Sequence, residues 1–322
     1  MRSFKKGIFT AAALAVIVLL NSFFNFAIIP YSYVRVSMHE MMTGKYETVY
    51  FGTSHGLCGI DPVTVERQTK QKGINMCFGG EYTRDVYYLL KSALLKGKPK
   101  QIVYELDPGY WVNKENEKGD FARLFWEMPM SSVKLEYFAD KMLNADFRTV
   151  LCPWFDYRSQ AANALSTIKT KLSKEYREYG TSTFQNAFQR YCEGGFIDKQ
   201  RVQMKKAPSP PLKWDKSSIQ KEAVQYFEKI VKLCREKDIK LTVITTPIPE
   251  STQKAEGREY GQANRFLDKY MKKQGVTYYN FNYMPESGAD RKPENFFDAE
   301  GHMYGDTARK FSEILGKYLK ES

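Results

Sequence analysis

The hydrophobic positions of this sequence fall into three patterns. An uncharged, mainly apolar run covers residues 7–29. Short runs rich in β-branched and aromatic residues follow, and each predicts a buried strand: 48–51, 73–78, 101–106, 239–245 and 276–281. Stretches with apolar residues at helical spacing lie after or between them: 63–70, 82–96, 215–237, 258–274 and 306–319. Strands that alternate with helices over short links indicate parallel βαβ units.

These elements predict an α/β fold: a three-layer, flavodoxin-like sandwich with a central, mainly parallel sheet of about five strands. The rhythm breaks at 111–214, which is rich in aromatic and basic residues and has helical patches but no clear strand alternation. We expect this segment to be a mostly helical insertion that serves as a lid or partner surface. Pro208 to Pro211 predict a stiff linker at its end. The sandwich is then split into halves at 45–110 and 215–322.

The N-terminal apolar run is long enough to cross a bilayer as a helix, which takes roughly 20 residues. Arg2, Lys5 and Lys6 precede it. The positive-inside rule therefore predicts a cytoplasmic tail at 1–6, a single transmembrane anchor at 7–29, a connector at 30–44 and the remainder outside the cell. A cleaved signal peptide is the alternative, but the run exceeds a typical signal core and no small-residue cleavage motif follows it. Asn21 and Asn25 would share one face of the anchor, where polar side chains often bond to neighbouring helices.

The net charge limits the classes of partner that this chain is expected to bind. The net charge is +12 and the pI about 9.2. Outside a membrane, such a charge favours anionic lipid headgroups or anionic wall polymers, although many of these lysines simply solvate the surface. No nucleic-acid motif is present, and no nucleic acid is expected as a partner.

The five cysteines form no CxxC pair and no metal spacing with histidine, so we expect no metal and no cofactor. Cys58 and Cys77 follow adjacent strands and could form one disulfide. Free, buried thiols are the favoured interpretation. Free thiols would suit a bacterium, expected to be Gram-positive, that does not rely on disulfides outside the cytoplasm.

The candidate nucleophile is Ser54, in the string Gly52-Thr53-Ser54-His55-Gly56 directly after the first strand. Open α/β sheets place their chemistry at the carboxyl ends of parallel strands. The alternative is a serine that only caps the next helix.

A serine needs a positioned base to take its proton. Of the three histidines, His302 lies in an acidic, glycine-containing loop before the last helix and is the candidate base. His39 lies in the connector and is not expected to be catalytic. His55 follows the nucleophile on a sharp turn, so its side chain is expected to point elsewhere and to be structural.

Other residues are predicted to surround this pair. Asp298 and Glu300 are rival candidates for the acid that orients His302. Gly79 and Gly80 follow the second strand and could offer backbone amides to an oxyanion, or could simply form a tight turn. The edge of a substrate site could include residues at or after the ends of the first, third and fourth strands: His55, Glu105, Asp107, Tyr110 and Thr246.

On these residues the chain resembles the SGNH/GDSL hydrolase superfamily, and more narrowly its membrane-anchored branch related to the D-alanyl-lipoteichoic acid transfer protein and alginate-type O-acetyltransferases. The resemblance covers about 45–110 and 215–319. It implies Ser54 as nucleophile, a glycine amide at Gly79 or Gly80 with the Ser54 amide in the oxyanion hole, and His302 as base. Two features depart from the pattern. Asp298 lies four residues before the histidine instead of three, and Glu300 lies two before it. The asparagine that the family usually carries after its third strand is missing, and the chain there reads Glu105-Leu106-Asp107.

The resemblance implies acyl transfer through an acyl-Ser54 intermediate to a wall polymer or exopolysaccharide, beside a membrane-bound O-acyltransferase partner. Three alternatives remain open. One is an esterase or deacetylase that releases the acyl group to water. Another is a non-catalytic protein that binds polymer or scaffolds the acyltransferase. A secreted lipase-like enzyme is the third, against which the retained anchor argues.

Overall fold

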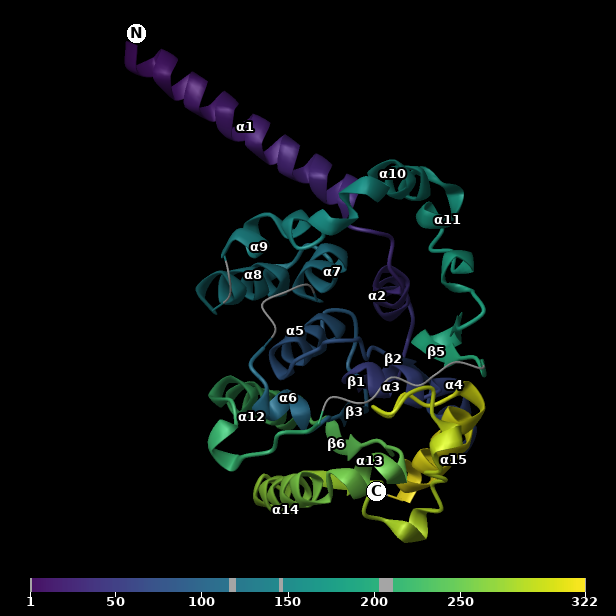
Figure 1. The fold of residues 1–322 in the computed structure, drawn as a ribbon. Helices are drawn as coiled ribbons and strands as arrows, with labels where there is room; N and C mark the ends of the chain where they lie inside the picture. The colour runs from purple at the N-terminus through teal and green to yellow at the C-terminus, as the bar shows by residue number, and fades with distance from the viewer. Residues whose placement is uncertain (1, 116–119, 145–146, 203–210, 322) are drawn as a thin grey trace. The chain divides into compact units, whose positions relative to one another are not determined.

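The computed structural model describes residues 2–115, 120–144, 147–202 and 211–321, so most of the predicted proline linker lies outside the described residues (Figure 1). The chain folds as two compact units. One consists of Met1–Arg35 and Glu117–Gly180, and the other of Val36–Asn116 and Thr181–Ser322. Helix α2 (Tyr33–Thr43) begins in the first unit and ends in the second.

The second unit is built on a parallel sheet of five strands in the order β2-β1-β3-β6-β7. The strands are β1 (Thr48–Phe51), β2 (Gly73–Asn75), β3 (Gln101–Glu105), β6 (Lys240–Thr245) and β7 (Thr277–Asn280). β1, β2 and β3 are buried throughout, which explains why they read as apolar runs without alternation. The predicted fold class, an α/β fold with a central parallel sheet of five strands, is confirmed.

Helices cover both faces of this sheet. Helix α4 (Pro62–Thr69) packs on α15 (Gly305–Glu321), and α5 (Thr83–Ala93) packs on α12 (Lys221–Glu236). On the α12 side, Trp111 of α6 (Gly109–Val112) contacts both α12 and α14 (Gly257–Lys273) through aromatic rings. Right-handed crossovers explain this division, because β1 to β2 runs in the opposite direction along the sheet from the later connections. The order reverses at β1, which lies between β2 and β3.

Local structure departs from the sequence prediction at three places. A short helix α3 (Ser54–Gly59) starts at the candidate nucleophile, where we expected only a turn. Asp215 caps a 3₁₀ turn (Lys216–Ser218) instead of the long helix, which starts at Lys221. The segment expected to lack strands contains the antiparallel pair β4 (Gln189–Cys192) and β5 (Phe196–Lys199), and β5 packs on α3 and α15. Strands of only four residues carry too little alternation for the sequence to predict this hairpin.

Further elements of the second unit are α13 (Glu250–Ala255) and short 3₁₀ turns: Ser182–Phe184, Glu193–Gly195, Pro285–Ser287 and Pro293–Asn295. The turns at Pro285 and Pro293 carry the chain from β7 to the loop before α15. This loop holds the candidate base.

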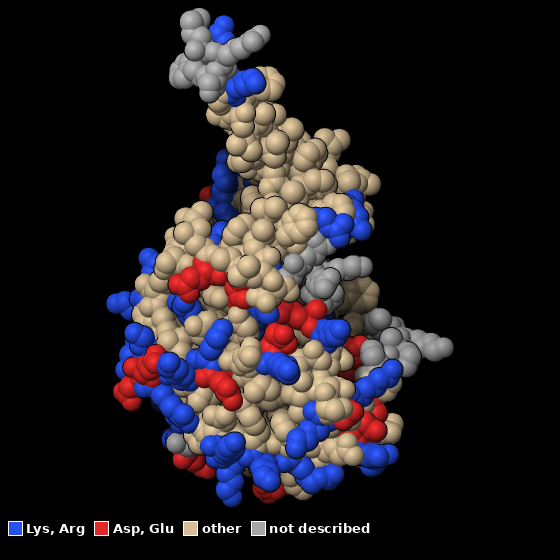
Figure 2. Space-filling view, turned by 90° about the vertical axis from the view of Figure 1, so that its left-hand side faces the viewer, with Lys and Arg blue, Asp and Glu red and all other residues tan. Residues whose placement is uncertain are grey.

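The first unit contains the apolar helix α1 (Arg2–Ile28) and the helices of the insertion: α7 (Asp120–Glu127), α8 (Ser132–Asn144), α9 (Phe147–Leu151), α10 (Ala164–Leu172) and α11 (Lys174–Arg177). Two 3₁₀ turns, Pro153–Phe155 and Arg158–Asn163, join α9 to α10. Within α1, Lys5–Ile28 is long and apolar enough to cross a membrane, and none of its most apolar stretch is buried. All charged residues of this helix lie in its first two turns, and basic side chains are seen near its free end in Figure 2.

Candidate active site

Ser54 is the first residue of α3, just beyond the carboxyl end of β1. Thr53 caps this helix, and its hydroxyl accepts a hydrogen bond from the amide of His55 at 3.2 Å. The neighbouring strands β1 and β3 are paired from Thr48↔Gln101 to Phe51↔Tyr104, so their carboxyl ends meet at the point where the strand order reverses. This is the crevice in which open α/β folds bind their ligands.

A buried carboxylate, that of Glu105, anchors the nucleophile loop through hydrogen bonds. Glu105 is fully buried, and its Oε2 accepts hydrogen bonds from the Thr53 amide and the Thr53 hydroxyl, each at 2.8 Å. Burial raises the pKa of this carboxyl. Gly52 has φ +148°, and a β-carbon there would collide with the backbone and side chain of Glu105. Glycine is therefore required at this turn. The sequence suggested Glu105 only as an edge residue, whereas the structure makes it a buried support.

His302 lies next to Ser54, although the two residues are 248 positions apart. Its Nε2 is 2.7 Å from the Ser54 Oγ, and its Nδ1 is 2.6 Å from the Asp298 Oδ2. A carboxylate can only accept, so Nδ1–H donates to Asp298. Nε2 then faces the serine hydroxyl with its lone pair, as a general base requires.

Asp298 is fixed by the loop that it shares with His302. Its Oδ1 accepts from the amides of Glu300, Gly301 and His302 at 3.1–3.2 Å. A bridge between Phe296 and Met303 closes this loop. Burial by itself would raise the pKa of Asp298, but the hydrogen bond and charge of His302, with the amides, lower the pKa to about 2. The loop therefore holds an ionised carboxylate against the imidazole.

Of the two rival acids, Asp298 makes the contact with His302. Glu300 is exposed, and its described contact within the loop is made by its backbone amide to Asp298. The spacing of four residues between Asp298 and His302, which departs from the family pattern, is accommodated by this loop.

The amides expected to hold an oxyanion lie close to the serine. A β-carbon placed on Gly79 would lie 3.9 Å from the Ser54 Cβ, and the next residue, Gly80, has φ +76°. Within the described part of the chain, the amides of Ser54, Gly79 and Gly80 donate no hydrogen bond. They are thus available to a substrate oxygen.

Asn75, at the end of β2, links α3, which begins with Ser54, to the segment that leads to Gly79. The sequence does not predict this role. The Asn75 Nδ2 donates to the carbonyls of Gly56 and Ile60 at 2.9 and 2.8 Å, and its Oδ1 accepts from the Cys77 amide at 2.9 Å. The side chain is fully buried. A polar residue inside an apolar strand run was the signal that could have drawn attention to it.

His55 lies beside the site, and the expectation that its side chain points elsewhere is wrong. Its ring centroid is 5.0 Å from that of His302, in an edge-to-face arrangement. Its Nδ1 is 3.5 Å from the Asp107 Oδ2. The other Asp107 oxygen accepts from the Gly109 amide at 2.7 Å, which holds this carboxylate at the end of β3. A second histidine–aspartate pair therefore adjoins the first, where the family pattern has an asparagine.

The remaining edge candidates, Tyr110 and Thr246, make the following contacts. Tyr110 packs its ring against Tyr82 with centroids 4.8 Å apart. Thr246 is buried against the end of α3, where a β-carbon on Gly59 would lie 3.7 Å from its Cγ2. His39 lies on α2, where its carbonyl accepts a hydrogen bond from the Thr43 hydroxyl.

The cysteines are all free thiols. Cys58, Cys77 and Cys234 are buried, and burial raises the pKa of Cys58 and of Cys234 to about 12. The Cys58–Cys77 disulfide that the sequence left open is not formed, in agreement with free thiols as the favoured interpretation. No cluster of three metal-ligating side chains occurs among residues 2–115, 120–144, 147–202 and 211–321.

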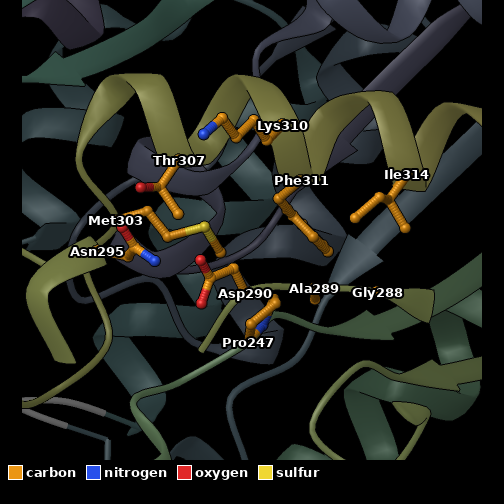
Figure 3. A pocket seen from close by; sticks show the side chains of 10 residues that line it. All are labelled: Pro247, Gly288, Ala289, Asp290, Asn295, Met303, Thr307, Lys310, Phe311 and Ile314. Carbon is orange, nitrogen blue, oxygen red and sulfur yellow. The ribbon is translucent and has the colours of Figure 1, made fainter. Parts of the chain in front are cut away.

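A small pocket lies behind the histidine loop (Figure 3). Met303 and Asn295 line it from this loop, and Thr307 and Phe311 line it from α15. Neither Ser54, His302 nor Asp298 contributes to it. The pocket is therefore separate from the serine crevice.

Fold and site together define an α/β protein with a hydrogen-bonded Ser-His-Asp arrangement at the carboxyl edge of a parallel sheet. No known family model and no curated protein matches the chain.

Several solved structures align with most of the chain at low identity, among them proteins described as GDSL-family and proteins described as esterases. A protein of the G-D-S-L lipolytic family from Desulfitobacterium hafniense DCB-2 is 8% identical with a TM-score of 0.41, over 85% of this chain and 99% of that one. The acetyl xylan esterase AlAXEase is 10% identical with a TM-score of 0.39, over 84% and 99%. The esterase EstA from a Pseudoalteromonas species is 8% identical with a TM-score of 0.36, over 85% and 97%. At identities and TM-scores this low, substrates and residue roles do not carry over.

Proposed function

We propose that this protein is a serine-dependent acyl-transfer enzyme of the SGNH type that works through an acyl-Ser54 intermediate. The observation that carries the proposal is the continuous hydrogen-bonded chain from the Ser54 hydroxyl through His302 to Asp298, with both contacts at 2.7 Å or less. Such a chain activates a hydroxyl that is otherwise a weak nucleophile.

The roles follow from the geometry. His302 Nε2 takes the proton as Ser54 Oγ attacks the acyl carbonyl, and Asp298 stabilises the imidazolium that forms. The unpaired amides of Ser54, Gly79 and Gly80 stabilise the oxyanion, where the loss of one donor typically costs about 3 kcal/mol of transition-state stabilisation. His302 then returns the proton to the leaving group and activates the acceptor that releases the acyl group.

We further propose that the acceptor is a hydroxyl of an extracellular polysaccharide or wall polymer, rather than water. Two features support this choice: an N-terminal helix suited to hold the enzyme at a membrane, and a net charge of +12 suited to an anionic polymer. Lys and Arg are spread widely over the face seen in Figure 2, with acidic residues among them. A membrane-bound O-acyltransferase that delivers the acyl group is the proposed partner.

The test uses the full-length protein in detergent, with Ser54→Ala and His302→Ala beside it. A fluorophosphonate should label the wild type at Ser54 and should label neither variant. Failure to label the wild type, with p-nitrophenyl acetate also left intact, would favour the non-catalytic scaffold.

The acceptor is tested separately. Turnover of p-nitrophenyl acetate with and without wall-polysaccharide fragments, followed by mass spectrometry, separates acetylated sugar from free acetate. Acetate as the sole product at saturating acceptor would assign the protein as an esterase or deacetylase.

A further inference from the structure

The helical unit carries an arrangement that is unusual for a protein surface in water. Helix α10 turns polar side chains inward and apolar side chains outward. Thr167 and Lys171 are only 8% and 4% exposed, whereas Leu165 and Leu172 are 77% and 63% exposed. Lys171 lies on the inner side, and its place there has a specific reason.

Lys171 caps the C-terminal end of α1. Its Nζ donates to the carbonyl of Phe26 at 2.8 Å and reaches that of Asn25 at 3.4 Å. The last four carbonyls of a helix lack partners within it, and a cation there also complements the helix dipole. α10 therefore lies against the end of α1, with its leucines on the other side.

The turn after α9 holds the same end of α1. Trp154 donates its ring Nε1–H to the Asn21 Oδ1 at 3.0 Å and its backbone amide to the Asn25 Oδ1 at 2.9 Å. Asn21 in turn donates to the carbonyl of Leu151 at 2.8 Å. The two asparagines thus share one helix face, as expected, and both bond to the insertion. Helix α10 lies beside the end of α1 in Figure 1, and the two 3₁₀ turns between α9 and α10 also contact α1.

These contacts determine the depth in the bilayer at which the helical unit would lie. From Gly7, just after the basic residues, a rise of 1.5 Å per residue places Asn21 about 21 Å and Phe26 about 28 Å along the helix. The hydrocarbon core of a bilayer is about 30 Å thick. If α1 spans the membrane, Trp154 lies at the outer interface, a position that tryptophan favours.

More apolar side chains are exposed on α10, on α9, whose last residue accepts a hydrogen bond from Asn21, and on α8, which packs on α9. They are Leu135 and Leu143 of α8, Phe147 and Leu151 of α9, and Leu165 and Leu172 of α10, with Leu143 84% exposed. Lys169 is exposed on the same side of α10 as the two leucines, where its long side chain can reach the headgroups. We call α8, α9 and α10 the collar.

We propose that the collar binds the membrane interface. The exposed leucine and phenylalanine side chains of α8, α9 and α10 insert into the outer leaflet around the end of α1. The leaflet is the occupant because the collar is continuous with α1, whose own apolar side chains are exposed at the same level and need acyl chains to cover them. The inference is independent of the acyl chemistry but rests on the proposed membrane span.

The test measures the surroundings of single side chains in the full-length protein. Cys152 and Cys192, which are not fully buried, are replaced by serine. A nitroxide is then attached at Leu165→Cys or Leu143→Cys, and at the exposed control position Glu313→Cys on α15. The protein is reconstituted in nanodiscs of phosphatidylcholine and phosphatidylglycerol. Power saturation compares collisions with oxygen, which concentrates in lipid, and with a water-soluble nickel chelate.

Nitroxides at 165 and 143 should collide mainly with oxygen, and the one at 313 mainly with the nickel chelate. Circular dichroism melting should match that of the parent for each variant, and two independent collar positions guard against one that fails to fold. Collar nitroxides that collide mainly with the nickel chelate would overturn the proposal. Protection from both reagents would also overturn it, and would assign the collar to a protein partner or a second copy.

Discussion

Replacing Asp298 with asparagine tests whether this carboxylate is the acid of the proposed triad. Asparagine is nearly isosteric but neutral, and its amide can present NH₂ to the His302 Nδ1–H, which favours the wrong tautomer. In a Ser-His-Asp protease the corresponding change lowers kcat by about 10⁴-fold. We therefore expect Asp298→Asn to lower the rate of fluorophosphonate labelling of Ser54 by three to four orders of magnitude, roughly.

The structure also gives the effect on stability. The pKa of Asp298 falls from an ordinary 3.8 to about 2 on folding. At about 1.36 kcal/mol per pKa unit, this difference corresponds to roughly 2 kcal/mol of folding free energy at neutral pH. Because the folded pKa is the lower one, the contribution is fully present above about pH 4 and is lost as the pH falls towards 2.

The assays are thermal unfolding from pH 7 to pH 2.5 and the labelling rate at pH 7, for wild type, Asp298→Asn and the matched control Glu300→Gln. Asp298→Asn should melt lower than wild type at pH 7, and the two should converge in acid. Glu300→Gln should behave as wild type in both assays, because its described loop contact is made by the backbone. The reasoning is refuted if Asp298→Asn labels within tenfold of wild type while Glu300→Gln loses labelling.

Three further outcomes are expected. Gly52→Ala should lower the melting temperature and abolish fluorophosphonate labelling of Ser54, because the new β-carbon would collide with Glu105. The control is Gly97→Ala, since Gly97 has open space around it. Equal behaviour of the two variants would contradict this reasoning. Glu105→Ala should destabilise by about 2 kcal/mol or more by leaving buried donors unpaired, measured by urea unfolding, and Glu105→Gln should recover part of this because an oxygen acceptor remains. His55→Ala should slow p-nitrophenyl acetate turnover by about tenfold or more, because its ring packs against that of His302. The melting temperature should stay the same, and unchanged kinetics would make His55 structural.

Much of the architecture was open to prediction because it depends on local patterns. Buried parallel strands read as short apolar runs, and β1, β3, β6 and β7 lie where those runs are. The alternation of strand and helix fixed the fold class. The antiparallel pair β4–β5 is not predicted by the sequence, because its four-residue strands mix buried, half-exposed and exposed positions and carry little periodicity.

The site was predicted only as a set of segments. The positions of Ser54 after a strand and of His302 before the last helix predict their roles, but the sequence does not give the distance between them. The acid stayed open between Asp298 and Glu300, since both are near His302 in sequence. The decision rests on the closed 296–303 loop, in which Asp298 accepts three amides and faces the imidazole.

By itself, the sequence determined the parallel sheet, the apolar N-terminal helix and the segments that carry the serine and the histidine. Each of these follows from the chemistry of neighbouring residues. Only the tertiary structure decided that Glu105 is buried beneath the nucleophile loop, that His55 lies against His302, and that Lys171 finishes α1 while α10 turns its leucines outward. These facts depend on packing between residues that are far apart in the chain, and no local pattern of hydrophobic and polar positions encodes such contacts.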